Sequence, residues 1–255
     1  MEPVILYDNR LNDGAPVATS EATGTSVLNL RDLRTYTFWQ AANTDEQTIT
    51  IDCGEPRPVD CLGIAGHNLG SIGATIDLQW CPDEQWGGNR ETVMSLTPEN
   101  DKSILRCFTQ EWKRHWRLRI TGMSAAPKMA VLMFGKRLQF PYPPESPYIP
   151  FKEIGEAETS RSKKGHALGT VIRYSPIEIN ARFANLPRDF VFEEYAPFWE
   201  GHARGMNQFF YSWDLDEFPE DAFFVKMKDG ATYQTPLSVL SLVDELVLDM
   251  EGTRE

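Results

Sequence analysis

Short stretches in which apolar and polar residues alternate dominate the first 140 residues. Residues 48–53 (TITIDC) alternate in this way, and residues 115–120 (HWRLRI) place Trp116, Leu118 and Ile120 on one face. A period of two is typical of a strand with one buried face. Glycine, proline and asparagine separate these stretches, and a helical period is almost absent. The pattern therefore predicts an antiparallel β-sandwich.

The second half of the chain alternates as well, with one interruption. Strand patterns cover residues 170–186, 208–213, 222–235 and 236–250, and the third of these is predicted to turn at Asp229-Gly230. The last of these also fits a helical period, but its alternating leucines favour a strand. Residues 187–204 (PRDFVFEEYAPFWEGHAR) predict a helix that begins at Pro187 and is kinked at Pro197.

The sharpest change of composition falls at residues 141–150 (PYPPESPYIP), where five of ten residues are proline. Proline has no backbone N–H to donate inside a sheet, so this stretch is expected to form an extended, semi-rigid linker. The sequence thus predicts two domains, residues 1–140 and residues 151–255. The expected fold class is mainly β, with one helix in the second domain.

Charge is spread unevenly over these two halves. Residues 1–140 hold 14 Lys and Arg against 17 Asp and Glu, and residues 141–255 hold 11 against 20, within a total of −12. An acidic surface repels phosphate and anionic lipid, so neither sequence-specific nucleic acid nor a membrane is an expected partner. The N-terminus lacks a basic start followed by an apolar run, so no signal peptide is predicted.

The cysteines and histidines form no recognisable metal or catalytic motif. The four cysteines are too widely spaced for a zinc knuckle and are predicted to be free thiols. His67 and Asn68 lie in a small-residue turn (GHNLG) between two apolar stretches, where asparagine and glycine suit a chain reversal. We interpret this pair as a structural corner, and we expect no enzyme activity, no cofactor and no bound metal.

Several segments of the first half follow one another in a recognisable order. They are NLRDLRTYTFWQA (residues 29–41), TITIDCG, VDCLGIAGHNLGS, ATIDLQW and RHWRLRIT. This order resembles the galactose-binding-like, discoidin-type jelly roll, and in particular the version found in tail proteins of bacteriophages. The resemblance covers residues 15–140.

In sugar-binding members of this family, loops at one end of the sandwich grip the ligand with aromatic and polar side chains. The resemblance therefore implies candidate carbohydrate-binding residues in two loops, namely Asp32, Arg34, Tyr36, Trp39, Trp86 and Arg90. The alternative is structural: Trp39 would pack in the core and Asp32 would cap a turn. The sequence favours this alternative, and neither loop has the dense Asp/Asn ladder of a calcium site.

Twelve aromatic residues crowd into 35 positions of the second half, more than a domain of this size needs for its own core. Some of them are therefore expected at a subunit interface. The predicted interface residues are Phe198, Trp199, Phe209, Tyr211 and Trp213. The order of elements in residues 155–255 also resembles the tail-tube fold of long-tailed phages. That resemblance implies a homo-oligomer, a hexameric ring built by β-strands of neighbouring subunits.

Together these observations favour a virion structural protein, a distal-tail or baseplate subunit located at the phage tail tip and assembled in the host cytoplasm. Its expected partners are copies of itself and the tube, hub and tape-measure proteins of the tail. The alternative is a carbohydrate-binding module that attaches the particle to host-surface glycans. Both functions rest on binding, without chemical conversion of a molecule.

Overall fold

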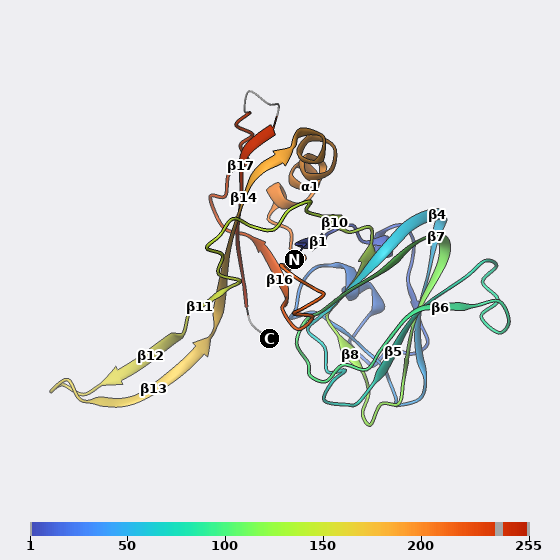
Figure 1. Ribbon diagram of the computed structural model, residues 1–255. Helices are drawn as coiled ribbons and strands as arrows, with labels where there is room; N and C mark the ends of the chain where they lie inside the picture. The colour runs from blue at the N-terminus through green and yellow to red at the C-terminus, as the bar shows by residue number, and fades with distance from the viewer. Residues whose placement is uncertain (1, 238–241, 254–255) are drawn as a thin grey trace. The chain divides into compact units, whose positions relative to one another are not determined.

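A computed structural model of the chain describes residues 2–237 and 242–253 (Figure 1). The chain forms two compact units. The first contains Met1–Phe140 together with Phe209–Phe223, and the second contains Pro141–Gln208 together with Phe224–Arg254. The segment Phe209–Phe223 thus lies with the first unit, whereas the sequence placed it in the second domain.

The first unit consists of antiparallel strands and two short 3₁₀ helices. Its strands are β1 (Val4–Leu6), β2 (Val17–Ala18), β3 (Trp39–Gln40), β4 (Gln47–Ala65), β5 (Thr75–Cys81), β6 (Glu91–Leu96), β7 (Ile104–Thr121), β8 (Lys128–Met129), β9 (Val131–Gly135), β10 (Leu138–Gln139) and β15 (Phe209–Ser212). The 3₁₀ helices are η1 (Arg10–Asn12) and η2 (Val27–Arg31). The main sheet has the order β2-β4-β7-β5-β6, with β9 also paired to β4, while β3 pairs with β8 and β1 lies between β10 and β15. The predicted mainly β, antiparallel fold class is confirmed.

The core of the first unit follows from the alternating pattern. Ile51 pairs in register with Trp116, and Ile49 pairs with Leu118. Their side chains are buried in one cluster, together with that of Ile120. Because successive side chains of a strand point to opposite faces, the polar residues between them fall on the other face of the sheet.

The GHNLG turn is a structural corner, as predicted. The His67 ring is buried, with Nε2 2.8 Å from the carbonyl oxygen of Lys102 and Nδ1 accepting from the backbone N–H of Leu69. The Asn68 side chain donates to the carbonyl of Ala126 and accepts from the N–H of Lys128. Both side chains thus satisfy backbone groups of distant segments, and burial lowers the pKa of His67.

All four cysteines are free thiols, as predicted. Cys61 and Cys107 lie opposite each other on β4 and β7, with their sulfur atoms 2.7 Å apart. Burial raises the pKa of the Cys53 thiol to about 12, so Cys53 stays protonated and behaves as a small apolar residue.

The second unit is organised around one long antiparallel pair. Its elements are β11 (Lys152–Glu153), β12 (Glu156–Arg161), β13 (Ala167–Tyr174), β14 (Pro176–Pro187), η3 (Phe190–Tyr195), α1 (Ala196–Gly201), η4 (Ala203–Gly205) and β17 (Leu242–Thr253). Strand β16 (Ala222–Met227) begins in the first unit and pairs with β17 in the second. In the β14–β17 pair, Phe183 lies opposite Leu246 and both side chains are buried.

The strand predicted over residues 236–250 is confirmed from Leu242 onward as β17, whereas residues 238–241 lie outside the described part of the chain. Residues 222–235 were predicted to form strand structure that turns at Asp229-Gly230; the first part is confirmed as β16, which ends at Met227, and the turn is present, but no strand follows it in residues 231–235. After that residue the chain turns through Gly230, whose φ of +86° suits glycine.

The helix predicted over residues 187–204 is present, but it begins after Pro187, which is the last residue of β14, and it is divided. A π-helical stretch, η3, precedes α1, and Pro197 occupies the first turn of α1. The N–H of Ala196 donates to the carbonyl of Val191, five residues back. Proline lacks an N–H and clashes with the carbonyl four residues before it, so the chain widens to the π geometry instead of kinking a regular α-helix. Within the described residues, no helix is long and apolar enough to cross a bilayer.

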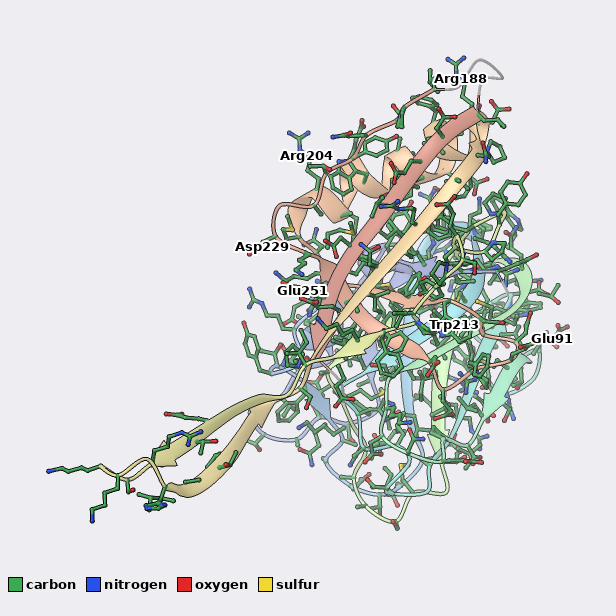
Figure 2. All side chains as sticks on the ribbon, turned by 60° about the vertical axis from the view of Figure 1, so that its left-hand side comes forward. Glu91, Arg188, Arg204, Trp213, Asp229 and Glu251 are labelled. Atoms are coloured by element: carbon green, nitrogen blue, oxygen red, sulfur yellow. The ribbon has the colours of Figure 1, made fainter. Side chains whose placement is uncertain are left out.

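Strands β12 and β13 form a separate two-stranded hairpin. They pair antiparallel, with Thr159 opposite Thr170 and their hydroxyl oxygens 3.0 Å apart. The hairpin extends as an arm away from the β14–β17 pair of its own unit (Figure 1), and Figure 2 shows its side chains spread along both strands. Most of its described side chains are exposed.

Candidate carbohydrate-binding surface

The first predicted loop does not offer the platform that the resemblance implied. Trp39 is 0% exposed, pairs with Met129 on β8, and donates from Nε1 to the carbonyl of Ser20 at 3.0 Å. Its indole therefore packs in the core, which confirms the structural alternative that the sequence favoured and leaves Trp39 without the ligand-binding role that the resemblance implied. Asp32 accepts from the N–H of Arg34 at 3.0 Å and from the Thr37 hydroxyl at 2.7 Å, so it caps its own turn.

The remaining two residues of that loop are exposed and contact each other. The guanidinium carbon of Arg34 lies 5.9 Å from the ring centroid of Tyr36, which is 74% exposed. A cation over an exposed ring is worth about 0.5–1 kcal/mol and keeps the pair in place. Both side chains therefore stay available on the surface.

The second predicted loop, residues 82–90 between β5 and β6, folds back on the sheet. The guanidinium carbon of Arg117 lies 4.5 Å from the Trp86 ring centroid, and Arg90 donates to the Trp86 carbonyl at 2.6 Å. Glu84 adopts a left-handed backbone with φ of +59°, which turns the chain within this loop. Trp86 and Arg90 line two different cavities.

The larger cavity, which we name the Trp112 pocket, has a volume of about 540 Å³. Its lining residues are Pro56, Trp80, Cys81, Pro82, Asn89, Arg90, Glu91, Trp112, Lys113 and Arg114. The pocket lies where the β4–β7 pairing shifts register between Asp52 and Arg57. Such a shift leaves extra residues on one strand and re-aims its side chains. Trp112 is 61% exposed at this position. Trp116, four residues further along β7, is fully buried.

Cations line this pocket together with its aromatic rings. Lys113 Nζ lies 3.4 Å from the centroid of the Trp80 ring. Arg114 donates to both carboxylate oxygens of Asp52 at 2.6 Å. These two hydrogen bonds hold the pKa of Asp52 well below its usual range, so Asp52 is ionised throughout the neutral and mildly acidic range. An indole face with several N–H donors beside it can stack on a planar or ring-shaped ligand and bind its oxygens.

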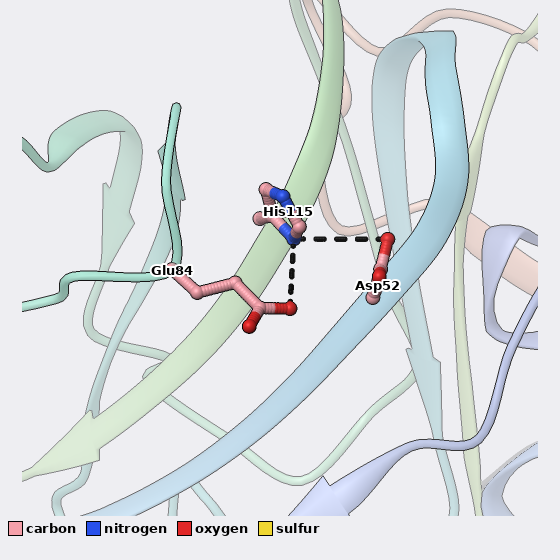
Figure 3. A group of neighbouring side chains, drawn as sticks. All are labelled: Asp52, Glu84 and His115. Carbon is pink, nitrogen blue, oxygen red and sulfur yellow. Dashed lines mark ion pairs between the residues drawn. The ribbon is translucent and has the colours of Figure 1, made fainter.

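The smaller cavity, about 300 Å³, adjoins a cluster of titratable side chains (Figure 3). His115 Nδ1 lies 3.1 Å from a Glu84 oxygen and 3.7 Å from an Asp52 oxygen. One ligand atom from each of the three residues lies within 4.8 Å of the other two. This cluster could not be predicted from the sequence, because each of the three residues is more than 30 positions from the other two and they form no motif.

The predicted interface aromatics are mostly part of the interior. Phe198, Phe209 and Tyr211 are fully buried, and Trp213 is buried with Nε1 donating to Asp221 at 3.0 Å. Tyr211 pairs with Ile5 of β1, so the N-terminal strand supplies part of its surroundings. Trp199 is half-buried, 5.7 Å from the Tyr233 ring centroid. The assignment of the four buried rings to a subunit interface is wrong, because the chain uses them in its own interior, whereas that of the half-buried Trp199 stays a prediction.

The sequence analysis also missed Trp80 and Trp112. A usable signal was present: residues 111–114 (EWKR) put an indole next to two cations, directly before the strand pattern HWRLRI. The alternation alone places Trp112 on the same face as Trp116, which suggests core. The two tryptophans differ in exposure because the register of the partner strand β4 shifts between Asp52 and Arg57.

No protein-family model and no curated protein matches this sequence. Solved structures resemble part of it. Chitosan-binding module 1 of a chitosanase/glucanase from Paenibacillus sp. IK-5 is 17% identical, with a TM-score of 0.44 over 51% of this chain and 100% of that one. The same values hold for CpGH89CBM32-5 from Clostridium perfringens, solved with GalNAc-β-1,3-galactose. The CBM32 of AlyQ, solved with 4,5-unsaturated mannuronic acid, is 21% identical, with a TM-score of 0.40 over 51% and 96% of the two chains.

Proposed function

We propose that the first unit binds carbohydrate in the Trp112 pocket. The observation that supports this most directly is the Trp112 indole, which is 61% exposed and lines a cavity of about 540 Å³. The apolar CH faces of a sugar ring stack on an indole, and the polar groups of Asn89, Arg90 and Glu91 can bind its hydroxyls. Binding sites commonly combine apolar area with a few placed polar groups in this way.

The charged residues that line the Trp112 pocket favour an acidic glycan over a neutral one. Three cations, Arg90, Lys113 and Arg114, line the pocket beside one acidic residue, Glu91. Arg114 is already paired with Asp52 and Lys113 with Glu111, so the lining cation left for an acidic ligand is Arg90. An acidic sugar such as a uronate would pair its carboxylate with Arg90. We therefore expect an acidic glycan to bind more tightly than a neutral one of the same backbone, with a difference that shrinks as salt is raised.

Replacing Trp112 with alanine tests the proposal. Glycan affinity is expected to fall roughly tenfold or more, because stacking and its buried area exceed about 1.4 kcal/mol. The unfolding midpoint should stay unchanged, since most of the side chain is exposed. Binding would be measured on a glycan array and then by calorimetry, with Tyr36→Ala as the matched control for an exposed ring elsewhere in the unit. Equal losses in both variants, or no loss in Trp112→Ala, would contradict the proposal.

A second function, assembly into a multi-subunit particle, is supported by the β12–β13 hairpin. An isolated two-stranded hairpin is marginally stable in water, and its open edges invite pairing with another chain. Leu168 and Val171 are 70% and 65% exposed on it. Its tip carries Arg161, Lys163 and Lys164, whereas the whole chain has a net charge of −12. A second copy of this chain therefore suits the arm in both charge and backbone pairing, as in a ring subunit of a phage tail tip.

The hairpin proposal predicts a change of oligomeric state. The full chain is expected to form a discrete oligomer in mass photometry, and the double variant Leu168→Asp, Val171→Asp is expected to be monomeric. Ile149→Asp, which adds one charge at a 69% exposed position outside the hairpin, should leave the oligomer intact. A wild-type chain that stays monomeric at every concentration would rule this function out.

A further inference from the structure

We propose that Asp52, Glu84 and His115 form a binding site for one divalent transition-metal ion of the zinc class. The three side chains converge beside the smaller cavity (Figure 3), and their ligand atoms lie within 4.8 Å of one another. This site is separate from the stacking surface of the Trp112 pocket, and it does not depend on carbohydrate binding.

Two of the three ligands stand on paired strands. Asp52 on β4 lies directly opposite His115 on β7, so the backbone register fixes their distance. Glu84 reaches the same point from the loop after β5, where its left-handed backbone turns the chain. A site with two ligands on rigid strands and one on a loop is preorganised and still accessible to an ion.

The histidine supplies an independent reason to expect a ligand. His115 is only 8% exposed, and its Nδ1 is buried without a hydrogen-bond partner among the described residues. A buried polar atom left unsatisfied costs about 1–3 kcal/mol. The carboxylate oxygens at 3.1 and 3.7 Å lie close to this nitrogen without hydrogen-bond geometry. Two ligands held about 2.1 Å from a tetrahedral zinc ion are about 3.4 Å apart, which lies between the two distances from His115 Nδ1 to the carboxylate oxygens.

The donor set decides the metal class. An imidazole nitrogen with two carboxylates suits zinc, cobalt or nickel, whereas calcium and magnesium prefer oxygen ligands alone. Three protein ligands leave the fourth position of a tetrahedral ion open. That position would face the cavity of about 300 Å³, which is also lined by Thr50 and Trp86.

Arg114 is the competitor of the metal for Asp52. It donates to both Asp52 oxygens, and the N–H of Gly54 also donates to Asp52 Oδ1 at 2.8 Å. A bound cation would have to share Asp52 with the guanidinium. Removing this positive charge with Arg114→Gln is therefore expected to raise the metal affinity, whereas removing a ligand lowers it.

The test uses the full chain, stripped with a chelator and titrated calorimetrically with zinc chloride. We expect one ion per chain, and a loss of affinity of about 100-fold or more in Glu84→Gln and in His115→Ala, since even outer-shell changes cost 10–100-fold. His166→Ala, which removes an exposed histidine from the hairpin tip, is the matched control and should bind as the wild type does.

Cobalt provides the second readout. Co²⁺ at this site should give visible absorption without the near-ultraviolet sulfur-to-cobalt bands that a cysteine ligand produces. Those bands, zinc binding that survives Glu84→Gln, or binding of Ca²⁺ in place of Zn²⁺ would each overturn the proposal. Because Glu84 is an exposed loop residue, Glu84→Gln decides the matter even if His115→Ala fails to fold.

Discussion

Replacing Trp39 with alanine is expected to lower the free energy of unfolding of the first unit by about 3–5 kcal/mol. The indole is completely buried among the core side chains of that unit, so truncation leaves a large cavity. It also leaves the carbonyl of Ser20 without the N–H that Trp39 donates to it. The loss would be measured by urea denaturation followed by circular dichroism.

Tyr36→Ala is the matched control, because Tyr36 lies three positions away and is 74% exposed. Its unfolding free energy should stay within about 0.5 kcal/mol of the wild type. Similar losses in both variants would contradict the placement of Trp39 in the core. So would a Trp39→Ala protein with unchanged stability and lost glycan binding, which would restore the ligand role that the family resemblance implied.

Gly135→Ala is expected to destabilise the first unit by about 3 kcal/mol, at the upper end of the usual range for an added methyl group in a packed site. A Cβ at this position would lie 1.9 Å from the carbonyl oxygen of Asp8 and 2.8 Å from its carbonyl carbon. Both are backbone atoms, so no side chain can rotate away. Strand β9 would have to separate from the N-terminal segment beside it.

The effect would be read from thermal denaturation. For a unit of this size, about 3 kcal/mol corresponds to a fall in Tm of roughly 6–12 °C. Gly87→Ala is the control, since a Cβ there meets no atom within 4 Å and its backbone lies outside the left-handed region. Gly87→Ala should leave Tm unchanged or slightly raised. A Gly135→Ala protein that melts with the control would show that the N-terminal segment does not pack against β9.

The sequence could predict the elements whose pattern is local. The alternation in residues 48–53 and 115–120 marks two core strands, because a half-buried strand must repeat every two residues. The GHNLG turn is likewise readable, since His67 and Asn68 act on backbone groups that any chain reversal leaves unpaired. The division of the helix at Pro197 also has a local cause, the missing N–H of proline.

The fate of individual aromatic residues could not be predicted in the same way. Trp112 and Trp116 have the same parity on one strand, yet one is 61% exposed and the other is buried. The difference arises on β4, where the register shifts between Asp52 and Arg57, more than 50 positions away in the sequence. Burial depends on which residue faces a side chain across the sheet, and that partner is not encoded in the residue's own neighbourhood.

What the sequence by itself determined is therefore the class of structure: antiparallel strands, the structural corner and free thiols, each set by short-range periodicity, turn chemistry or composition. What only the tertiary structure decided is the surface. The return of Phe209–Phe223 to the first unit buries aromatics that the sequence assigned to a subunit interface. The convergence of Asp52, Glu84 and His115 needs two strands and a loop to meet. Both follow from pairing between strands that are far apart in the sequence. The free energy of such pairing depends on the whole fold and cannot be assigned to one stretch of sequence.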